Sequence, residues 1–290
     1  MRQRVRGAIV LTVAPVVAVA ASCGGGQQEQ LAEKAAPAAM ATAPTDSLPA
    51  AILGKAPPPR GEAVHYFEGD TATRGYLVVP EGEGPFPAVI LIHEWNGLND
   101  RVRQVADALA DEGYVALAAD LYSGRTGSNR DENVALMQEV HSNPERTIAN
   151  LDAAARFLRA RPDVTGKIAT IGWCFGGGIA LSYAIGGEHH EGTAIFYGSL
   201  VEDPEKLARL NHEIYGTFAG QDQGIPPEAV ERFAAALRNA GIPNDIHVYD
   251  AVNHGFWLWV DRDPEHNTGP AADAWRRLKA YLGRTLGGAA

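Results

Sequence analysis

The sequence has 290 residues, of which 46% are hydrophobic and 21% are charged, with 32 Gly, 18 Pro and 2 Cys. This composition is typical of a globular protein and excludes a disordered, collagen-like or disulfide-stapled chain. Two cysteines permit at most one disulfide and exclude a four-thiolate zinc site. The formal net charge of −10 argues against a nucleic-acid partner, because phosphate binding needs a clustered excess of Lys and Arg.

Residues 1–22 have the pattern of an export signal. Three arginines lie within residues 1–6, and residues 7–22 contain no charged side chain. That run is shorter than the ~20 residues that a membrane-spanning helix needs. Small residues precede Cys23, which resembles a bacterial lipoprotein signal, although Leu is usual where this chain has Ala20. We therefore expect a lipid on Cys23 and a location on the periplasmic or outer side of a membrane, with an ordinary signal peptide as the alternative.

Residues 23–60 are predicted to be a flexible tether. After Cys23 they read GGGQQEQ, continue with Ala, Pro, Thr and Lys, and contain a PPP run near their end. A segment of this kind has no apolar periodicity with which to build a core. The folded domain is therefore predicted to span residues 61–290, with Cys174 as its only cysteine.

The remainder of the chain alternates predicted strands and helices. A hairpin is expected at residues 64–67 and 76–79, and buried strands at residues 88–92, 114–119, 167–171, 193–197, 214–218 and 245–249. Amphipathic helices are expected at residues 99–112, 132–140, 145–159, 176–185, 227–240 and 271–286. This order predicts one α/β domain with a mostly parallel sheet and helices on both faces.

The most informative motif is IATIGWCFGGG at residues 168–178, because a buried strand runs directly into a helix of small residues. Its centre, GWCFG, is the G-x-nucleophile-x-G elbow with Cys174 in the place of serine. Both glycines are required because a Cβ atom on either would strike a neighbouring strand or helix. The first N–H groups of the following helix can then face an oxyanion. A buried structural cysteine beside packing glycines is the alternative.

Two further residues complete a candidate triad. Asp222 follows a predicted strand 48 residues after Cys174, and His254 follows the last strand 32 residues later. Nucleophile, acid and histidine in this order are typical of the α/β-hydrolase fold. All three are expected at the carboxyl ends of strands, where open α/β sheets place their sites. Taken singly, Asp222 could be a turn former and His254 a surface residue.

The wider pattern resembles the dienelactone hydrolase family over residues 63–282. The matching segments are HEWNG at residues 93–97, ADLYSG at residues 119–124, GWCFGG, AGQD and the loop of His254. The resemblance implies an α/β-hydrolase fold and attack by a thiolate on a lactone or ester carbonyl. An acyl-thioester would form and be hydrolysed, as in a carboxymethylenebutenolidase, without a metal or organic cofactor.

The resemblance also implies a role for each site residue. Cys174 would be the nucleophile, with His254 as its base and Asp222 as the group that orients the base. Glu94 would pair with the resting thiol and help to deprotonate it. The backbone N–H groups of Trp95 and Phe175 would form the oxyanion hole.

The family's substrate-binding positions depart from this pattern. Family members that act on the dienelactone hold its carboxylate with two arginines, one of which follows the D-L-Y motif. Here Arg125 stands one residue late, and the second position, four residues after His254, is Leu258. The candidate substrate-binding residues are Arg125, Tyr122 and Trp257, and we expect a rather apolar pocket. Alternatively, Arg125 is a solvated loop residue, and Trp257 and Trp259 pack the C-terminal helix.

Other features carry less weight. Metal binding by the His189-His190 pair is a minor possibility, and residues 123–150 form either part of a cap over the pocket or an ordinary connection. The expected partner is a small-molecule ester or lactone, and no oligomeric state is predicted. Two other functions stay open, namely a secreted esterase or thioesterase for a neutral or aromatic acyl substrate, and a ligand-binding lipoprotein without turnover.

Overall fold

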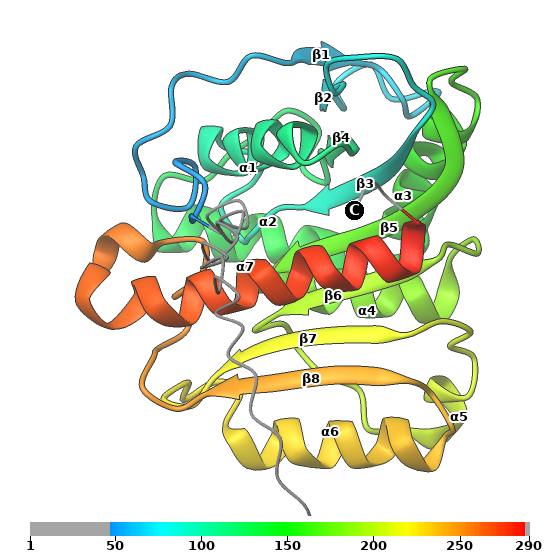
Figure 1. Ribbon diagram of the computed structural model, residues 1–290. Helices are drawn as coiled ribbons and strands as arrows, with labels where there is room; N and C mark the ends of the chain where they lie inside the picture. The colour runs from blue at the N-terminus through cyan, green and yellow to red at the C-terminus, as the bar shows by residue number, and fades with distance from the viewer. Residues whose placement is uncertain (1–46, 288–290) are drawn as a thin grey trace, which may run out of the picture. The chain divides into compact units, whose positions relative to one another are not determined.

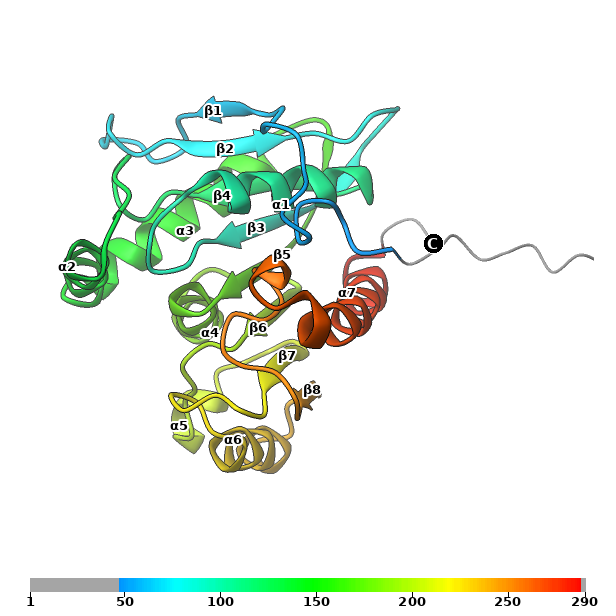
Figure 2. The same ribbon diagram turned by 90° about the vertical axis from the view of Figure 1, so that its left-hand side faces the viewer.

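The computed structural model describes residues 47–287 (Figures 1 and 2). The predicted signal peptide and Cys23 lie outside the described residues. The strands are β1 (Glu62–Val64), β2 (Gly75–Val78), β3 (Phe86–Ile92), β4 (Val115–Ala119), β5 (Val164–Trp173), β6 (Gly192–Phe196), β7 (Ile214–Ala219) and β8 (Asn244–Tyr249). The helices are α1 (Asp100–Asp111), α2 (Arg130–His141), α3 (Pro144–Arg159), α4 (Phe175–Gly186), α5 (Pro204–Leu207), α6 (Pro227–Asn239), the 3-10 turn η1 (Val260–Arg262) and α7 (Pro264–Leu286).

The strands form one sheet in the order β1-β2-β4-β3-β5-β6-β7-β8. β1 and β2 are the predicted hairpin, and β2 is antiparallel to β4. All the other neighbouring strands are parallel. In Figure 1 the arrowheads of β6, β7 and β8 point to the left, and Figure 2 therefore looks onto the carboxyl ends of these strands. The predicted mostly parallel α/β sheet is confirmed.

Helices cover both faces of the sheet because the central strands are apolar on both. In β3, Val89 and Leu91 pack with α1 and α7, whereas Ile90 and Ile92 pack with α3 and α4. A separate cluster joins β6 and β7 to α5 and α6. Figure 2 shows α4 and α7 on opposite sides of the strands. Successive residues of a strand point to opposite faces, so these runs need cover on both sides.

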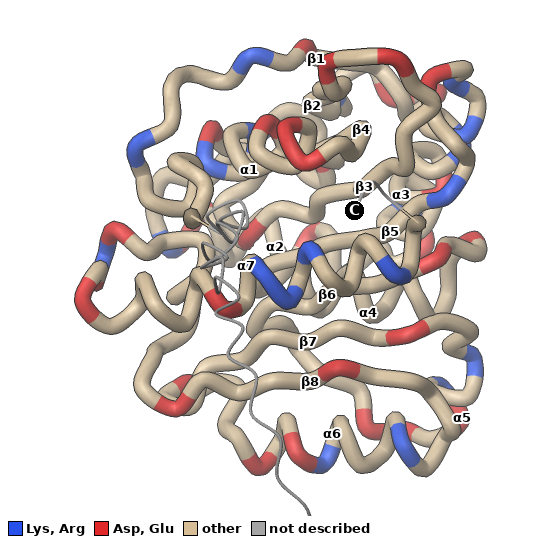
Figure 3. Tube along the Cα trace, in the orientation of Figure 1, with Lys and Arg blue, Asp and Glu red and all other residues tan. Residues whose placement is uncertain are grey.

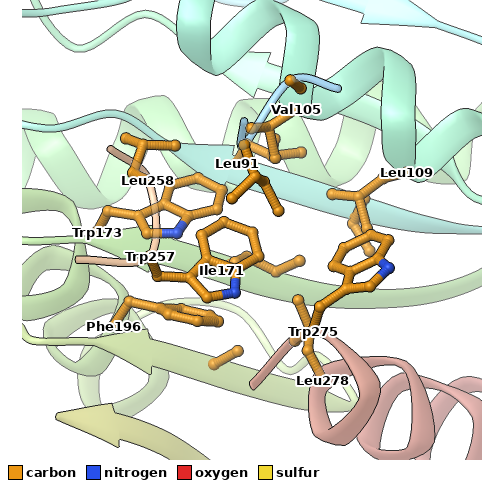
Figure 4. Close-up of a cluster of buried hydrophobic side chains, with 14 of the residues drawn as sticks. Leu91, Val105, Leu109, Ile171, Trp173, Phe196, Trp257, Leu258, Trp275 and Leu278 are labelled. Carbon is orange, nitrogen blue, oxygen red and sulfur yellow. The ribbon is translucent and has the colours of Figure 1, made fainter. Parts of the chain in front are cut away.

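The core on the α1 and α7 side is rich in aromatic side chains (Figure 4). Trp173 of β5 stacks on Trp257 of the loop after β8, with ring centroids 5.7 Å apart. Trp257 also lies 6.1 Å from Trp275 of α7, and Leu258 is fully buried beside them. The loop that carries His254 is therefore anchored by its own apolar residues.

Some predicted boundaries were wrong. β1 ends at Val64, where a strand was predicted to begin, and the short helix α5 was not predicted. Helix α7 begins at Pro264 rather than at residue 271 and continues through Pro270. Asp263 caps α7 by accepting a hydrogen bond from the His266 N–H. Pro264 occupies the first helical position, where proline is tolerated.

The folded domain also begins before residue 61. Leu48, Ala51 and Ile52 are buried and belong to the core beside α1. Arg101 of α1 donates a hydrogen bond to the carbonyl oxygen of Ile52 over 3.2 Å. The prediction that residues up to 60 bury no core was therefore wrong for this stretch, because three apolar residues in a turn cannot be recognised by periodicity.

Charges of both signs are distributed over the surface. In Figure 3, α6 carries acidic and basic positions side by side, and basic positions follow one another along α7. Many are paired across elements, for example Arg277 of α7 with Asp245 of β8. Within residues 47–287, no helix has the length and apolar character needed to cross a bilayer.

Candidate active site

Cys174 occupies the sharp turn between β5 and α4. Its backbone has φ 55° and ψ −117°, a conformation that few non-glycine residues adopt. The turn is held by its own N–H, which donates to the carbonyl oxygen of Phe196 over 2.9 Å. The Cys174 side chain is half-buried. Backbone strain of this kind is found at nucleophile elbows, where it exposes the reactive side chain at the top of the sheet.

The glycines of the motif meet the expected steric requirement. A Cβ atom on Gly172 would lie 2.1 Å from the carbonyl oxygen of Gly176. The strand and the helix thus approach each other more closely than any side chain would permit.

His254 and Asp222 are brought together by the ends of β7 and β8. His254 Nδ1 lies 2.6 Å from Asp222 Oδ2. The other carboxylate oxygen, Asp222 Oδ1, accepts the backbone N–H groups of Gly224 and Ile225 over 2.8 and 3.2 Å. Because the carboxylate is fixed by its own loop, it can fix the imidazole in turn. Nε2 is the nitrogen left to interact with Cys174.

The ionisation of these groups supports a coupled triad. Burial lowers the pKa of His254, but hydrogen bonds to Asp222 and Cys174 outweigh burial and raise it to about 10. Burial raises the pKa of Asp222, yet the hydrogen bond and positive charge of His254 leave it below its usual value. The imidazole therefore holds a proton readily between a carboxylate and a sulfur.

Glu94 lies directly after β3 and is buried, with 5% of its surface exposed. Its Oε2 accepts a hydrogen bond from Trp259 Nε1 over 2.6 Å. The structure thus gives Glu94 an indole as its partner, where the family resemblance implied the resting Cys174 thiol. Burial raises the pKa of Glu94, while the hydrogen bond from Trp259 and the charges of Arg262, His254 and Arg101 act in the opposite direction.

The two residues expected to form the oxyanion hole stand at adjacent strand ends. Phe175 is the first residue of α4, where a helix leaves its N–H groups without intrahelical partners. Trp95 follows Glu94 after β3, and its carbonyl oxygen accepts the Tyr122 hydroxyl over 3.0 Å. Among the described residues, the N–H groups of Trp95 and Phe175 have no hydrogen-bond acceptor.

The predicted substrate-binding residues are placed differently. The ring of Tyr122 lies 5.8 Å from that of Phe175, the residue after Cys174, whereas Arg125 and Trp257 contact other parts of the fold. Tyr122 is buried, and its hydroxyl donates a hydrogen bond to the carbonyl oxygen of Trp95, so it supports the loop after β3. Arg125 forms an ion pair with Glu139 over 2.7 Å and lines a cavity of about 500 Å³ between β2 and α1. Trp257 is fully buried in the core, where its ring stacks on Trp173, which agrees with the packing alternative.

Leu258 is fully buried beside Trp257. The family position four residues after the histidine therefore faces the core in this chain, and Leu258 does not make a pocket more apolar. The adjacent Trp259 is half-buried and bonds to Glu94.

The histidine pair is structural. His190 is buried and its Nε2 lies 2.9 Å from Thr193 Oγ1, while His189 lies 3.7 Å from Glu191. Across the described residues, no cluster of three or more His, Cys, Asp or Glu side chains could hold a metal ion. In the stretch considered as a cap, Leu136 and Val140 of α2 pack into the sheet-covering core.

Three residues near the site escaped the sequence analysis. Arg101 and Arg262 stack on the ring of Trp259, with their Cζ atoms 4.5 and 4.3 Å from its centroid. The ring of Tyr197, at the end of β6, lies 4.9 Å from that of His254. No local signal marks them, because α1, β6 and η1 approach one another only in the fold.

Comparison with known proteins places this geometry in a family. The model of the dienelactone hydrolase family matches residues 73–286. The chain belongs to the dienelactone hydrolase family. It is accordingly a hydrolase of the ester and lactone class, and the α/β-hydrolase fold expected from the order of its motifs is confirmed.

Relatives are similar over most of the domain. A protein of Methylorubrum extorquens, named as a carboxymethylenebutenolidase, is 31% identical over 226 residues, which cover 73% of this chain and 77% of the relative. One of Escherichia coli K12 with the same name is 30% identical and covers 74% and 83%.

Solved structures share the fold. A structure from Klebsiella pneumoniae, described as a dienelactone hydrolase, is 27% identical with a TM-score of 0.69 and covers 78% of this chain and 98% of its own. A dienelactone hydrolase-like promiscuous phosphotriesterase from metagenomic libraries has a TM-score of 0.70 at 24% identity. The latter shows the fold alone.

Proposed function

We propose that this dienelactone hydrolase family member hydrolyses a lactone or carboxylic ester through an acyl-thioester on Cys174. The observation that carries the proposal is the pairing of His254 with Asp222, over 2.6 Å between Nδ1 and Oδ2, beside the sheet edge at which the strained elbow carries Cys174. A nucleophile, a base and an orienting carboxylate joined in this way are the requirements of covalent acyl transfer.

The first step forms the thioester. The thiol proton passes to Glu94, and the Cys174 sulfur attacks the carbonyl carbon. His254, paired with Asp222, carries its own proton at this stage. The carbonyl oxygen becomes an oxyanion, which accepts hydrogen bonds from the backbone N–H groups of Trp95 and Phe175 in the proposed scheme. Collapse of this intermediate breaks the carbon–oxygen ester bond, and the imidazolium of His254 donates its proton to the leaving alkoxide. In a lactone, the released hydroxyl stays attached to the acyl group.

The second step releases the acid. His254 takes a proton from water, and the resulting hydroxide attacks the thioester carbonyl carbon. The tetrahedral intermediate collapses by breaking the carbon–sulfur bond, and Glu94 returns its proton to the sulfur, while His254 keeps the proton from water. Asp222 orients the imidazole and stabilises its charged form throughout.

A burst assay tests the covalent mechanism. The full chain carrying Cys23→Ser would be mixed with a chromogenic ester, with and without stoichiometric iodoacetamide, and the modified residue located by mass spectrometry. We expect a burst equal to the active thiol content and its loss when Cys174 is alkylated. Turnover that survives complete alkylation of Cys174 would overturn the proposal. A folded protein with no turnover on any ester or lactone would favour the ligand-binding alternative.

The substrate's charge can be tested in the same assay. Arg125 is held by Glu139, and position 258 carries a buried leucine. Neither family arginine position thus offers a free cation, which supports an ester with a neutral or aromatic acyl group. We expect kcat/KM for a neutral aryl ester to exceed that for a matched anionic ester. A higher kcat/KM for the anionic ester would favour a dicarboxylate-type substrate instead.

We also propose that the chain is exported and lipid-modified at Cys23, on the basis of residues 1–23. Growth with a radiolabelled fatty acid should label the wild-type protein but not Cys23→Ser. Label on neither protein would favour an ordinary signal peptide.

A further inference from the structure

The Glu94 carboxyl is held by a half-buried indole whose ring contacts two guanidinium groups, which together form a clamp. Trp259 Nε1 donates to Glu94 Oε2 over 2.6 Å. Arg101 and Arg262 stack on the same ring, with Cζ atoms 4.5 and 4.3 Å from its centroid. Cation–π contacts of this kind attract the ring and favour its observed position. The donor that faces Glu94 is therefore not free to turn away.

Arg101, the first arginine of the clamp, is itself held by several partners. Its Nη1 donates to the carbonyl oxygens of Leu258 and Ile52 over 2.8 and 3.2 Å, and its Nη2 contacts Asp261 over 3.0 Å. Only 9% of the Arg101 side chain is exposed. The orientation of Trp259 thus depends on α1, on the N-terminal turn and on the loop after β8 together.

Arg262, the second arginine of the clamp, is exposed. It makes no ion pair with any residue in the described part of the chain. Its charge therefore remains available to act on Glu94, which it stabilises in the charged form. The other ionisable groups facing this carboxyl are Arg101, His254 and the buried Tyr197.

We propose that Trp259 is a positioning residue of the hydrolase: its indole N–H fixes the Glu94 carboxylate and so sets the pH range in which Glu94 can accept the Cys174 proton. This inference rests on the proposed function. A buried carboxyl that loses its hydrogen-bond donor is harder to ionise. Without the indole N–H, Glu94 would become a carboxylate only at higher pH.

The test compares Trp259→Phe with Trp257→Phe. Both substitutions replace an indole by a phenyl ring, but the Trp257 N–H is buried without a partner and makes no hydrogen bond to lose. The pH profile of kcat/KM would be measured on the full chain. We expect Trp259→Phe to move the acidic limb upward by about one pH unit, the usual weight of a hydrogen bond to a charged group. Trp257→Phe should leave the limb in place.

A second readout does not depend on turnover. The rate of iodoacetamide modification at Cys174 would be followed against pH in the same variants, and its acidic limb should move in the same way. In a Glu94→Gln background, Trp259→Phe should cause no additional shift. An unmoved limb, or an equal shift in Trp257→Phe, would overturn the inference. If no ester were turned over, the proposed function would fail, and the alkylation profile would still decide the role of Trp259.

Arg262→Met provides a variant that is safe for folding, because this side chain is exposed. It should shift the acidic limb upward by a smaller amount, since it removes a nearby positive charge and one of the two arginine contacts with the Trp259 ring. Arg238→Met, an exposed arginine of α6, is the control for the change in net charge. A wild-type profile in Arg262→Met would count against the clamp, even if Trp259→Phe failed to fold.

Discussion

The carbonyl oxygen of Ile92 lies 2.2 Å from the position that a Cβ atom on Gly176 would occupy. Helix α4 consequently starts directly against the end of β3. Glu94 lies two residues after Ile92, in the loop that follows this strand. This close approach holds the nucleophile turn and the Glu94 loop together. It depends on the absence of a single methyl group.

Gly176→Ala should therefore damage both stability and turnover. The backbone must shift to relieve the contact with Ile92, at a cost of about 1–3 kcal/mol or more. The same shift would displace Cys174 and lower kcat. Gly283→Ala in α7 is the matched control, because its added methyl group meets no atom within 4 Å. Thermal unfolding and ester turnover measure the two effects, and a Gly176→Ala protein that matched wild type in both would contradict the close contact.

Asp222→Asn should reduce kcat by about 10⁴-fold while the protein stays folded, because His254 loses its orienting charge. Circular dichroism would monitor the fold, and single-turnover kinetics the thioester. Full activity in this variant would show that Asp222 has been assigned wrongly.

The same pair predicts a pH dependence of stability. The pKa of His254 is raised to about 10, so its contribution is fully present below its unfolded value of about 6.5 and disappears as pH rises through 10. The pKa of Asp222 is lowered, so its contribution is lost only in acid, below about pH 4. The difference in Tm between wild type and Asp222→Asn should be largest near pH 5–6 and smallest above pH 10. A difference that grows toward pH 10 would argue against the pair.

Leu258→Arg should not recreate a carboxylate site. The side chain at this position is fully buried, so an arginine there would place an unpaired charge in the core at a cost of more than about 3 kcal/mol. Asn253→Arg, in an exposed position of the same loop, should change the free energy of unfolding far less. A stable Leu258→Arg protein with a new preference for anionic esters would mean that this residue can reach the pocket.

Ile52→Ala tests the N-terminal boundary of the fold. Ile52 is fully buried, so the substitution should lower the free energy of unfolding by about 2–5 kcal/mol. Lys55→Ala, at an exposed position three residues later, should stay within about 0.5 kcal/mol of wild type. Equal effects in chemical denaturation would return residues 47–60 to the tether.

The sequence by itself determined the α/β order, the elbow around Cys174 and the family. These follow from local rules: apolar runs mark strands buried on both faces, and the glycines flanking Cys174 mark a turn that excludes a Cβ atom. Asp222 and His254 were predictable because the carboxyl ends of parallel strands meet at one edge of the sheet.

Only the tertiary structure decided how the site is supported. Whether Trp257, Leu258 or Trp259 faces the core depends on the path of an irregular loop, which has no period to read. The partner of Glu94 comes from 165 residues away along the chain, and the clamp on Trp259 joins α1 to η1. Ile52 is likewise buried by a tertiary contact, because it packs against α1 and the core beside it. A short apolar turn has no sequence pattern that predicts such a contact.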